Sequence, residues 1–310
     1  MAEINLATNL ATSTEMSLEA FLAAPREAIK AFAPASMVYA AAGTRRSAAL
    51  AGLPGGGDAY ARWNYTQMLH TCDLIFQHGV RHIFTILAAP GQFAEVGPYR
   101  RGLTDWMHWA FTSAEARAEA ACYPWKLRLW TDGAIPELLP LQQATVAESA
   151  GAEQMLWCLA ISDTNALWQQ ILTAAIDQRA TTRAAAAAAY YGQEVPPVTL
   201  YLAFGKPVVS PDLLPPLLMD KVQCYWTQQP GYRLSEEDLR RILYDCAFVR
   251  PTWQADKSTR GENALAHRSA WERGPILGLG RRLGPFWYPQ DFQMPAEEEE
   301  TNGDDPCRPV

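Results

Sequence analysis

Short runs of apolar residues recur along the chain, and most are followed by a turn signal and a longer segment with helical spacing. The runs cover residues 37–42, 82–88, 126–130, 155–161, 198–204 and 222–226. Apolar runs of this length are typical of strands that are buried on both faces of a parallel sheet. Because these strands alternate with helices, we predict a single α/β domain with a central, mostly parallel six-stranded sheet flanked by helices.

The segments between the runs predict the helices. The longest is expected to begin at Asp58, a good N-cap residue, and to end at Gly79. A capping signature at Ser235 predicts the start of another, which continues over residues 239–249. Further helices are expected at residues 103–122, 140–152 and 165–190, after a short one that begins at Ser17.

The two ends of the chain differ from the rest in composition. Residues 1–17 are polar and irregular, and residues 293–310 include the acidic run Glu297–Glu300. We expect a flexible N-terminus over residues 1–17, one folded domain over residues 18–292 and an acidic disordered tail over residues 293–310.

Charge and cysteine usage narrow the classes of function. A net charge of −7 without a basic block argues against a nucleic-acid partner. The apolar runs are far shorter than a bilayer requires, so no membrane span is expected. Six cysteines show no paired spacing, and the first five are predicted to be buried free thiols. A reducing compartment, and hence a cytoplasmic protein, is the expectation.

The main candidate for chemistry follows the first apolar run. Gly43 and Thr44 come directly after it, followed by Arg45 and Arg46 and a helical pattern. A glycine turn between strand and helix leaves backbone N–H groups unpaired, and two guanidinium groups beside them suit a diphosphate. The same sheet edge would collect residues 90–99, 132–133, 162–163 and 205–206. Paired arginines are also common on plain solvated surfaces, so the residues alone predict only an anion near a sheet edge.

Several short motifs are only moderately specific one by one, but their order and spacing along the chain together resemble those of known protein families. One set comprises Gly43-Thr-Arg-Arg46, Phe76-Gln-His-Gly79, Tyr190-Tyr-Gly192 and Leu239-Arg-Arg-Ile-Leu-Tyr-Asp245. It resembles the tuberculosinyl adenosine transferase branch of the cis-prenyltransferase fold. A second set comprises Gly91-Gln-Phe-Ala-Glu95, Gln223-Cys-Tyr-Trp226, His267-Arg-Ser-Ala-Trp271 and Leu283-Gly-Pro-Phe-Trp-Tyr-Pro289. It resembles, more closely, the fungal sesquiterpene synthases of abscisic acid biosynthesis, which make α-ionylideneethane from farnesyl diphosphate. The resemblance covers about residues 35–290.

The resemblance implies a catalytic domain that binds farnesyl diphosphate, with Mg²⁺ as cofactor and a homodimer as the assembly. The diphosphate would be bound by Gly43, Thr44, Arg45, Arg46 and Lys206. The prenyl chain would lie against Tyr65, Met68, Leu69 and Cys72, although plain core packing is the more common role of such residues.

One departure from the family concerns the metal. The family's first strand ends in a metal-binding aspartate, and Ala42 stands at that position. Glu95 is therefore the first candidate for metal ligand or base, and Asp132 the second candidate for metal ligand. Tyr99 is an alternative base. A solvated loop glutamate and a turn aspartate are the competing interpretations of Glu95 and Asp132.

Three functions fit these observations. The preferred one is a sesquiterpene synthase, a carbon–oxygen lyase that ionises farnesyl diphosphate and releases an α-ionylideneethane-type hydrocarbon and pyrophosphate. The second is a prenyl transferase that passes the prenyl group to an acceptor or elongates it in cis. The third is a non-catalytic partner subunit, against which the presence of both Arg45 and Arg46 argues.

Overall fold

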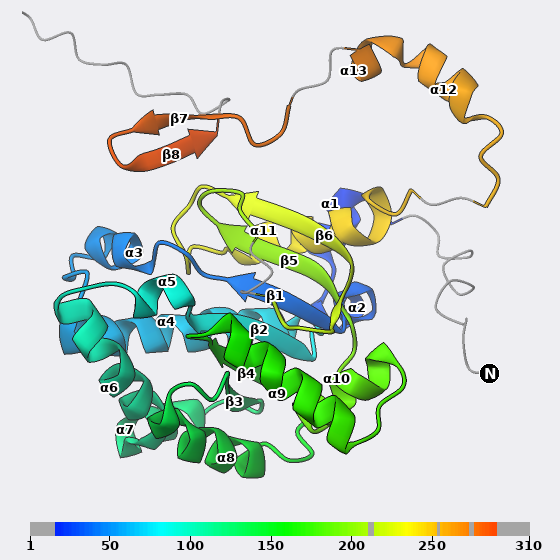
Figure 1. Ribbon diagram of the computed structural model, residues 1–310. Helices are drawn as coiled ribbons and strands as arrows, with labels where there is room; N and C mark the ends of the chain where they lie inside the picture. Colours follow the sequence, from blue (N-terminus) through cyan, green and yellow to red (C-terminus); the bar gives the residue numbers. More distant parts are fainter. Residues whose placement is uncertain (1–15, 210–213, 253–254, 273–275, 290–310) are drawn as a thin grey trace, which may run out of the picture. The chain divides into compact units, whose positions relative to one another are not determined.

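The computed structural model describes residues 16–209, 214–252, 255–272 and 276–289, without the side chains of residues 98–101. It contains two compact units, residues 1–260 and residues 261–310. The first unit is an α/β domain built on one sheet (Figure 1). The strands are β1 (Ser36–Ala40), β2 (His82–Ala88), β3 (Lys126–Thr131), β4 (Met155–Ala160), β5 (Val198–Phe204) and β6 (Met219–Thr227).

The sheet has the order β3-β4-β2-β1-β5-β6, and all five pairings between neighbouring strands are parallel. The prediction of a parallel six-stranded sheet is confirmed. β1 lies between β2 and β5, pairing Val38 with Phe84 on one side and with Tyr201 on the other. The turn that follows β1 is therefore flanked by the carboxyl ends of two other strands, which places it where ligands bind in open parallel sheets.

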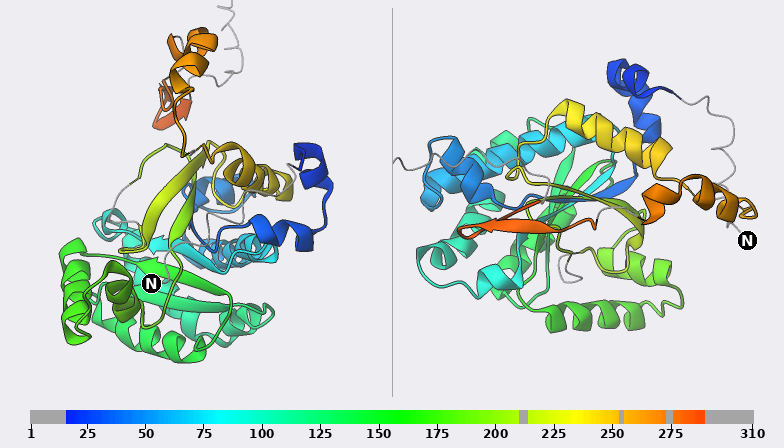
Figure 2. Two further views of the ribbon diagram at one scale, coloured as in Figure 1. Left: turned by 90° about the vertical axis from the view of Figure 1, so that its right-hand side faces the viewer. Right: turned by 90° about the horizontal axis from the view of Figure 1, so that it is seen from above.

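Helices cover both faces of the sheet. In chain order they are α1 (Leu18–Ala23), α2 (Arg26–Ile29), α3 (Thr44–Leu50), α4 (Gly57–Gln77), α5 (Pro90–Phe93), α6 (Pro98–Thr112), α7 (Ala114–Ala120), α8 (Leu139–Glu148), α9 (Thr164–Asp177), α10 (Arg183–Tyr191) and α11 (Glu236–Tyr244). One core packs α1, α4, α6 and α11 against the sheet, and a second packs α9 and α10 against the opposite face. Figure 2 shows these two layers on either side of the strands.

Alternate side chains of each strand supply the two cores. Tyr39 of β1 belongs to the α4 side, and its neighbour Val38 belongs to the α9 side. The same division holds for β4, where Cys158 and Trp157 point into opposite cores. Because β1, β2, β4 and β5 are largely buried on both faces, they contain few polar positions and are readable as nearly continuous apolar runs. The edge strands β3 and β6 are partly exposed and include Lys126, Asp220 and Lys221.

Two predicted helices are broken in the structure. The helix predicted at residues 103–122 is divided at Ser113, whose side chain accepts a hydrogen bond from Ala116 N and caps α7. The helix predicted at residues 165–190 is divided between α9 and α10, where Arg179 has φ of 50° and Thr182 caps α10. Asp58 lies inside the first turn of α4 rather than at its N-cap, which is Gly56.

The second unit contains α12 (Arg260–Ala266), which starts at the boundary, α13 (Arg268–Glu272), and the antiparallel pair β7 (Gly280–Leu283) and β8 (Phe286–Pro289). The domain predicted at residues 18–292 spans both units. The boundary at residue 292, the acidic tail and most of the N-terminal segment lie outside the described residues, so they stay predictions.

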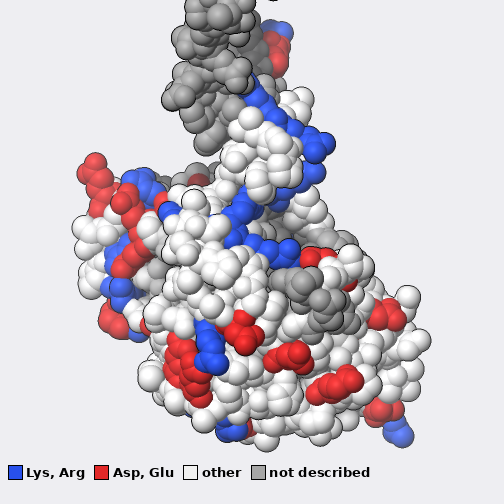
Figure 3. Space-filling model, turned by 90° about the vertical axis from the view of Figure 1, so that its left-hand side faces the viewer, with Lys and Arg blue, Asp and Glu red and all other residues white. Residues whose placement is uncertain are grey.

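The charged side chains are unevenly distributed over the surface. The face in Figure 3 carries both basic and acidic side chains, and several separate acidic groups lie on its lower part. Among the described helices none is long and apolar enough to span a membrane. Cys72 and Cys158 are buried free thiols, as predicted. Cys224 and Cys246 are free but only half-buried, and Cys122 is exposed because it lies in the turn after α7.

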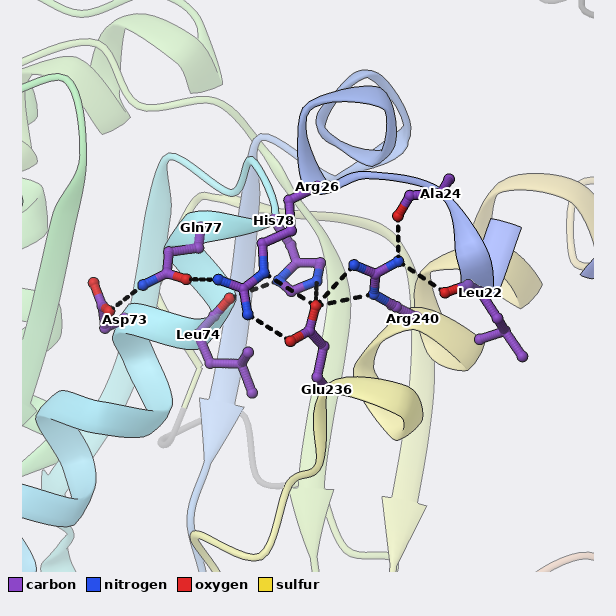
Figure 4. A network of polar contacts seen from close by, with 9 residues as sticks. All are labelled: Leu22, Ala24, Arg26, Asp73, Leu74, Gln77, His78, Glu236 and Arg240. Carbon is purple, nitrogen blue, oxygen red and sulfur yellow. Dashed lines mark hydrogen bonds and ion pairs between the residues drawn. The ribbon is translucent and has the colours of Figure 1, made fainter. Parts of the chain in front are cut away.

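A polar network joins the N-terminal helices to the domain (Figure 4). Glu236, at the start of α11, accepts hydrogen bonds from Arg26 Nε at 3.0 Å and Arg240 Nη2 at 2.8 Å. His78 Nε2, which is buried, lies 3.3 Å from the same carboxylate. Arg240 also donates to two backbone carbonyls at the end of α1. These hydrogen bonds, Arg26 first, lower the pKa of Glu236 to about 2. The network assigns Arg240 a structural role.

Candidate functional site

A cavity of about 610 Å³ lies at the carboxyl ends of β1, β2 and β5. Its wall is formed by residues 40–46, by the side chains of α4 that face the sheet edge, and by the turn after β5. Tyr232, from the loop that precedes α11, completes it. A volume of this size is in the range of small-molecule sites. The cavity is therefore placed where the strand order predicts a ligand.

Gly43 determines how the turn after β1 is built. Its φ is 77°, in the left-handed region that favours glycine, and α3 begins at the next residue. A Cβ at this position would lie 2.5 Å from Nη2 of Arg46. The same nitrogen is 3.5 Å from the position of a Cβ on Gly205, at the end of β5. The Arg46 guanidinium thus packs over two glycine turns at adjacent strand ends.

Thr44 and Tyr60 connect this turn to the helix beside it. Thr44 Oγ1 and the Tyr60 hydroxyl share a hydrogen bond of 2.6 Å, and both residues line the cavity. The bond joins the start of α3 to the first turns of α4. It holds the polar end of the cavity at a fixed position along α4.

Arg45 is engaged by Glu95. Its Nη2 donates to both carboxylate oxygens of Glu95, at 2.9 and 3.1 Å, and both side chains are partly exposed. Glu95 follows α5 and is not among the residues that line the cavity. A carboxylate on a guanidinium is the arrangement that a phosphate oxygen could replace.

Lys206, in the turn after β5, completes a group of three cationic side chains around the cavity. All five residues predicted to bind the diphosphate, from two separate segments of the chain, line this one cavity: Gly43, Thr44, Arg45, Arg46 and Lys206. Ala42 also lines it, contributing a methyl group at the strand end. The site is consequently suited to an anion of high charge.

The predicted prenyl-binding residues fall in three places. Met68 lines the cavity. Tyr65 lines a neighbouring space of about 80 Å³ between α4 and α6, and its hydroxyl donates to Ala116 O. Leu69 and Cys72 are fully buried in the core on the α4 side of the sheet, and neither lines the cavity in the part of the chain that the structure describes.

Asp132 lies apart from the cavity and holds two other strand ends together. Its carboxylate is almost fully buried and accepts hydrogen bonds from the backbone N–H groups of Ala134, Ser162 and Asp163. It therefore ties the turn after β3 to the turn after β4. The side chain of Tyr99 lies outside the described residues.

The described side chains do not offer a site for Mg²⁺ held by protein ligands. Among them no group of three His, Cys, Asp or Glu residues comes together as a metal site would require. The strand end carries Ala42, and the Glu95 carboxylate is engaged by Arg45. Mg²⁺ often binds through one or two carboxylates together with substrate phosphates, so Mg²⁺ as a cofactor stays a prediction.

Sequence reasoning missed Asn64, which lines the cavity between Tyr60 and Met68 on α4. The three residues are four apart, so they share one helix face. The signal was available in the sequence as a polar residue that interrupts this face. The spacing alone could not show that the face meets a cavity rather than the core.

No family model matches the chain. It is 45% identical to the (+)-kolavelool synthase of Herpetosiphon aurantiacus over 283 residues, which cover 91% of this chain and 98% of that protein. It is 31% identical to the tuberculosinyl adenosine transferase of Mycobacterium tuberculosis over 104 residues, or 32% of this chain and 34% of that protein. A probable undecaprenyl diphosphate synthase from Campylobacter jejuni is similar in structure, with a TM-score of 0.51 and 11% identity over 71% of this chain and 98% of that one.

Proposed function

The chain belongs to the family of terpene synthases that includes (+)-kolavelool synthase, and we propose that it ionises a prenyl diphosphate in the cavity between β1 and β5. The observation that carries the proposal is the convergence of Arg45, Arg46 and Lys206 on a single cavity. The structural similarity to an undecaprenyl diphosphate synthase supports the fold alone.

The positive groups would act on the leaving group. When the allylic carbon–oxygen bond breaks, its electron pair departs with the pyrophosphate, which gains negative charge. Groups already in place around that position stabilise the transition state more than the ground state. Arg46 is suited to this role because its guanidinium packs over the turns at Gly43 and Gly205. Arg45 would exchange the Glu95 carboxylate for a phosphate oxygen.

The apolar part of the site would hold the prenyl chain. Met68 and Leu87 line both the cavity and the small space beside α6, so an apolar path leads away from the cationic end. Enclosure by such side chains limits the access of bulk water to an allyl cation. The fungal resemblance favours farnesyl diphosphate as substrate and an α-ionylideneethane-type hydrocarbon as product. Both assignments, and a role of Glu95 or Tyr99 as base, stay predictions from that resemblance.

A second candidate function is transfer of the prenyl group to an acceptor. The local similarity to tuberculosinyl adenosine transferase favours it over about a third of the chain. Mg²⁺ as cofactor, a homodimer, a place in abscisic acid biosynthesis and a cytoplasmic location stay predictions. No step of the proposed reaction depends on them.

The purified full-length chain should be incubated with geranyl, farnesyl and geranylgeranyl diphosphates, with and without Mg²⁺. We expect release of pyrophosphate and of a terpene without any acceptor. Arg45→Ala should reduce turnover to background, because the diphosphate loses one of its three cations. A requirement for an acceptor would support the transferase. Absence of pyrophosphate with all three substrates would contradict the proposal and leave the partner-subunit function.

A further inference from the structure

Tyr232, in the wall of the cavity, has a backbone conformation that is unfavourable for a tyrosine. Its φ is 72°, in the left-handed region that glycine adopts freely and bulky residues adopt rarely. Gly231 comes directly before it, but the left-handed conformation falls on the tyrosine and not on that glycine. Backbone strain of this kind persists only where the surrounding structure enforces it, and it is concentrated at functional sites.

The loop that carries Tyr232 is bound to the turn after β1. Gly231 N donates to Ala42 O at 2.8 Å, and Ser47 Oγ donates to Gly231 O at 2.5 Å. A Cβ on Gly231 would lie 3.0 Å from the carbonyl carbon of Ala41, so the two backbones touch and glycine is required there. These contacts enforce the strain, and they hold Tyr232 beside the strand end at which the diphosphate is proposed to bind.

The side chain of Tyr232 offers the cavity an aromatic surface and not a base. It is half-buried, since it packs against the core on the α4 side and also lines the cavity. Its ring lies 6.2 Å from the ring of Trp63 in an edge-to-face arrangement. Burial raises the pKa of Tyr232 well above its ordinary value, so the hydroxyl keeps its proton. The face of such a ring is negative and attracts cations.

The other aromatic residues of the cavity wall offer less of their surface. Tyr60 and Tyr201 are each 4% exposed, and Phe204 is 1% exposed. The Tyr60 hydroxyl is also engaged by Thr44. Among the described residues that line the cavity, Tyr232 is therefore the aromatic side chain with the most accessible ring.

The inference rests on the proposed function, in which the allylic carbon–oxygen bond breaks. Pyrophosphate takes the electron pair, and the positive charge stays on the allyl group. Arg45, Arg46 and Lys206 stabilise the leaving group, but their charge opposes the cation that is left behind. An aromatic face can stabilise that cation, because it is neither a base nor a strong nucleophile. We propose that Tyr232 is a catalytic residue whose ring stabilises the allyl cation, without forming a bond or transferring a proton.

The first test varies the ring and measures the rate of pyrophosphate release in a single turnover. Tyr232→Phe keeps the ring and should retain most of the rate. Tyr232→Leu should lower it about 30-fold, the effect of losing a cation–π contact that is shielded from water. Phenylalanine with an increasing number of ring fluorines at position 232 should lower the rate stepwise, because fluorine weakens the negative potential of the ring face. This series changes the volume little, so it tests the inference even if Tyr232→Leu does not fold.

A second test separates charge from packing by binding. The ligands are a prenyl diphosphate analogue with an ammonium group near the allylic carbon and a neutral thiolodiphosphate analogue. Tyr232→Leu should bind the ammonium analogue about 30-fold more weakly and the neutral one almost as the wild type does. Tyr123→Leu is the matched control. Tyr123 is a half-buried aromatic residue that stacks on Trp125 and is outside the lining of the cavity, so its loss should change neither affinity nor rate.

Thermal unfolding shows whether each variant is folded. A rate that does not respond to ring fluorination, or equal losses of affinity for the two analogues in Tyr232→Leu, would overturn the inference, because Tyr232 would then act through packing alone. Wild-type protein that binds neither analogue and releases no pyrophosphate would instead overturn the proposed function.

Discussion

Replacing Gly43 by alanine should separate the stability of the fold from the binding of a diphosphate. The substitution adds a Cβ at φ of 77°, where that atom would lie 2.5 Å from Nη2 and 2.9 Å from Nε of Arg46. These atoms are at the far end of a flexible side chain, so the guanidinium can move away. We therefore expect the domain to remain folded while Arg46 leaves its position over the turn.

The two effects have different magnitudes. An alanine in the left-handed region costs about 1–2 kcal/mol, which for a domain of this size lowers the unfolding temperature by roughly 2–8 °C. Loss of one charge-assisted hydrogen-bonding group costs about 1.5–3 kcal/mol of transition-state stabilisation. We expect kcat/KM for the prenyl diphosphate to fall about 10- to 150-fold.

Gly52→Ala provides a matched control. Gly52 has the same φ of 77°, and no atom of the described residues lies within 4 Å of the position that a Cβ would take there. Both variants should lose similar stability in thermal unfolding, but only Gly43→Ala should lose kcat/KM and affinity for pyrophosphate. If Gly43→Ala kept the wild-type kcat/KM with the same loss of stability as Gly52→Ala, the Arg46 guanidinium would have no role at the leaving group.

Two further predictions concern carboxylates. Glu95→Gln should retain turnover and tighten inhibition by pyrophosphate up to about fivefold. The reason is that the exposed ion pair of Glu95 with Arg45, which competes with pyrophosphate, is worth up to about 1 kcal/mol. Lost turnover with an altered Mg²⁺ dependence would instead support Glu95 as base or metal ligand. Glu236 has a pKa lowered from 4.5 to about 2, so its contribution to the free energy of unfolding should be complete above pH 4.5 and lost as the pH falls to about 2. The shift corresponds to about 3 kcal/mol, which we reduce to about 1 kcal/mol because 35% of the side chain is exposed. Glu236→Gln should flatten this part of the acid-unfolding profile, and an unchanged profile would contradict the assigned pKa.

The sheet was predictable because its central strands β1, β2, β4 and β5 are largely buried on both faces. The run at residues 82–88 predicts β2 with the bounds that the structure shows, since nearly every position must be apolar. Helix continuity was harder to predict. Ser113 and Thr182 act as caps only because the chain changes direction there, and helical spacing on either side does not reveal the break.

The sequence predicted that the candidate site lies at the carboxyl edge of the sheet, but not the contacts of its individual side chains. Gly43 and Lys206 come together because they follow neighbouring parallel strands, which a correct topology implies. The sequence could not distinguish the two arginines, of which Arg45 meets Glu95 and Arg46 packs on glycine turns. Nor could it show that the N–H groups of another strand end surround Asp132, because that depends on tertiary contacts.

The central claim is that this cavity binds the diphosphate of a prenyl substrate. A crystal structure of the full-length chain with a farnesyl thiolodiphosphate analogue, which resists ionisation, tests it most directly. We predict that the diphosphate lies against Gly43, Arg46 and Lys206, with the prenyl chain directed along α4 past Asn64. A diphosphate bound elsewhere, for example beside Asp132, or a prenyl chain directed away from α4, would contradict it.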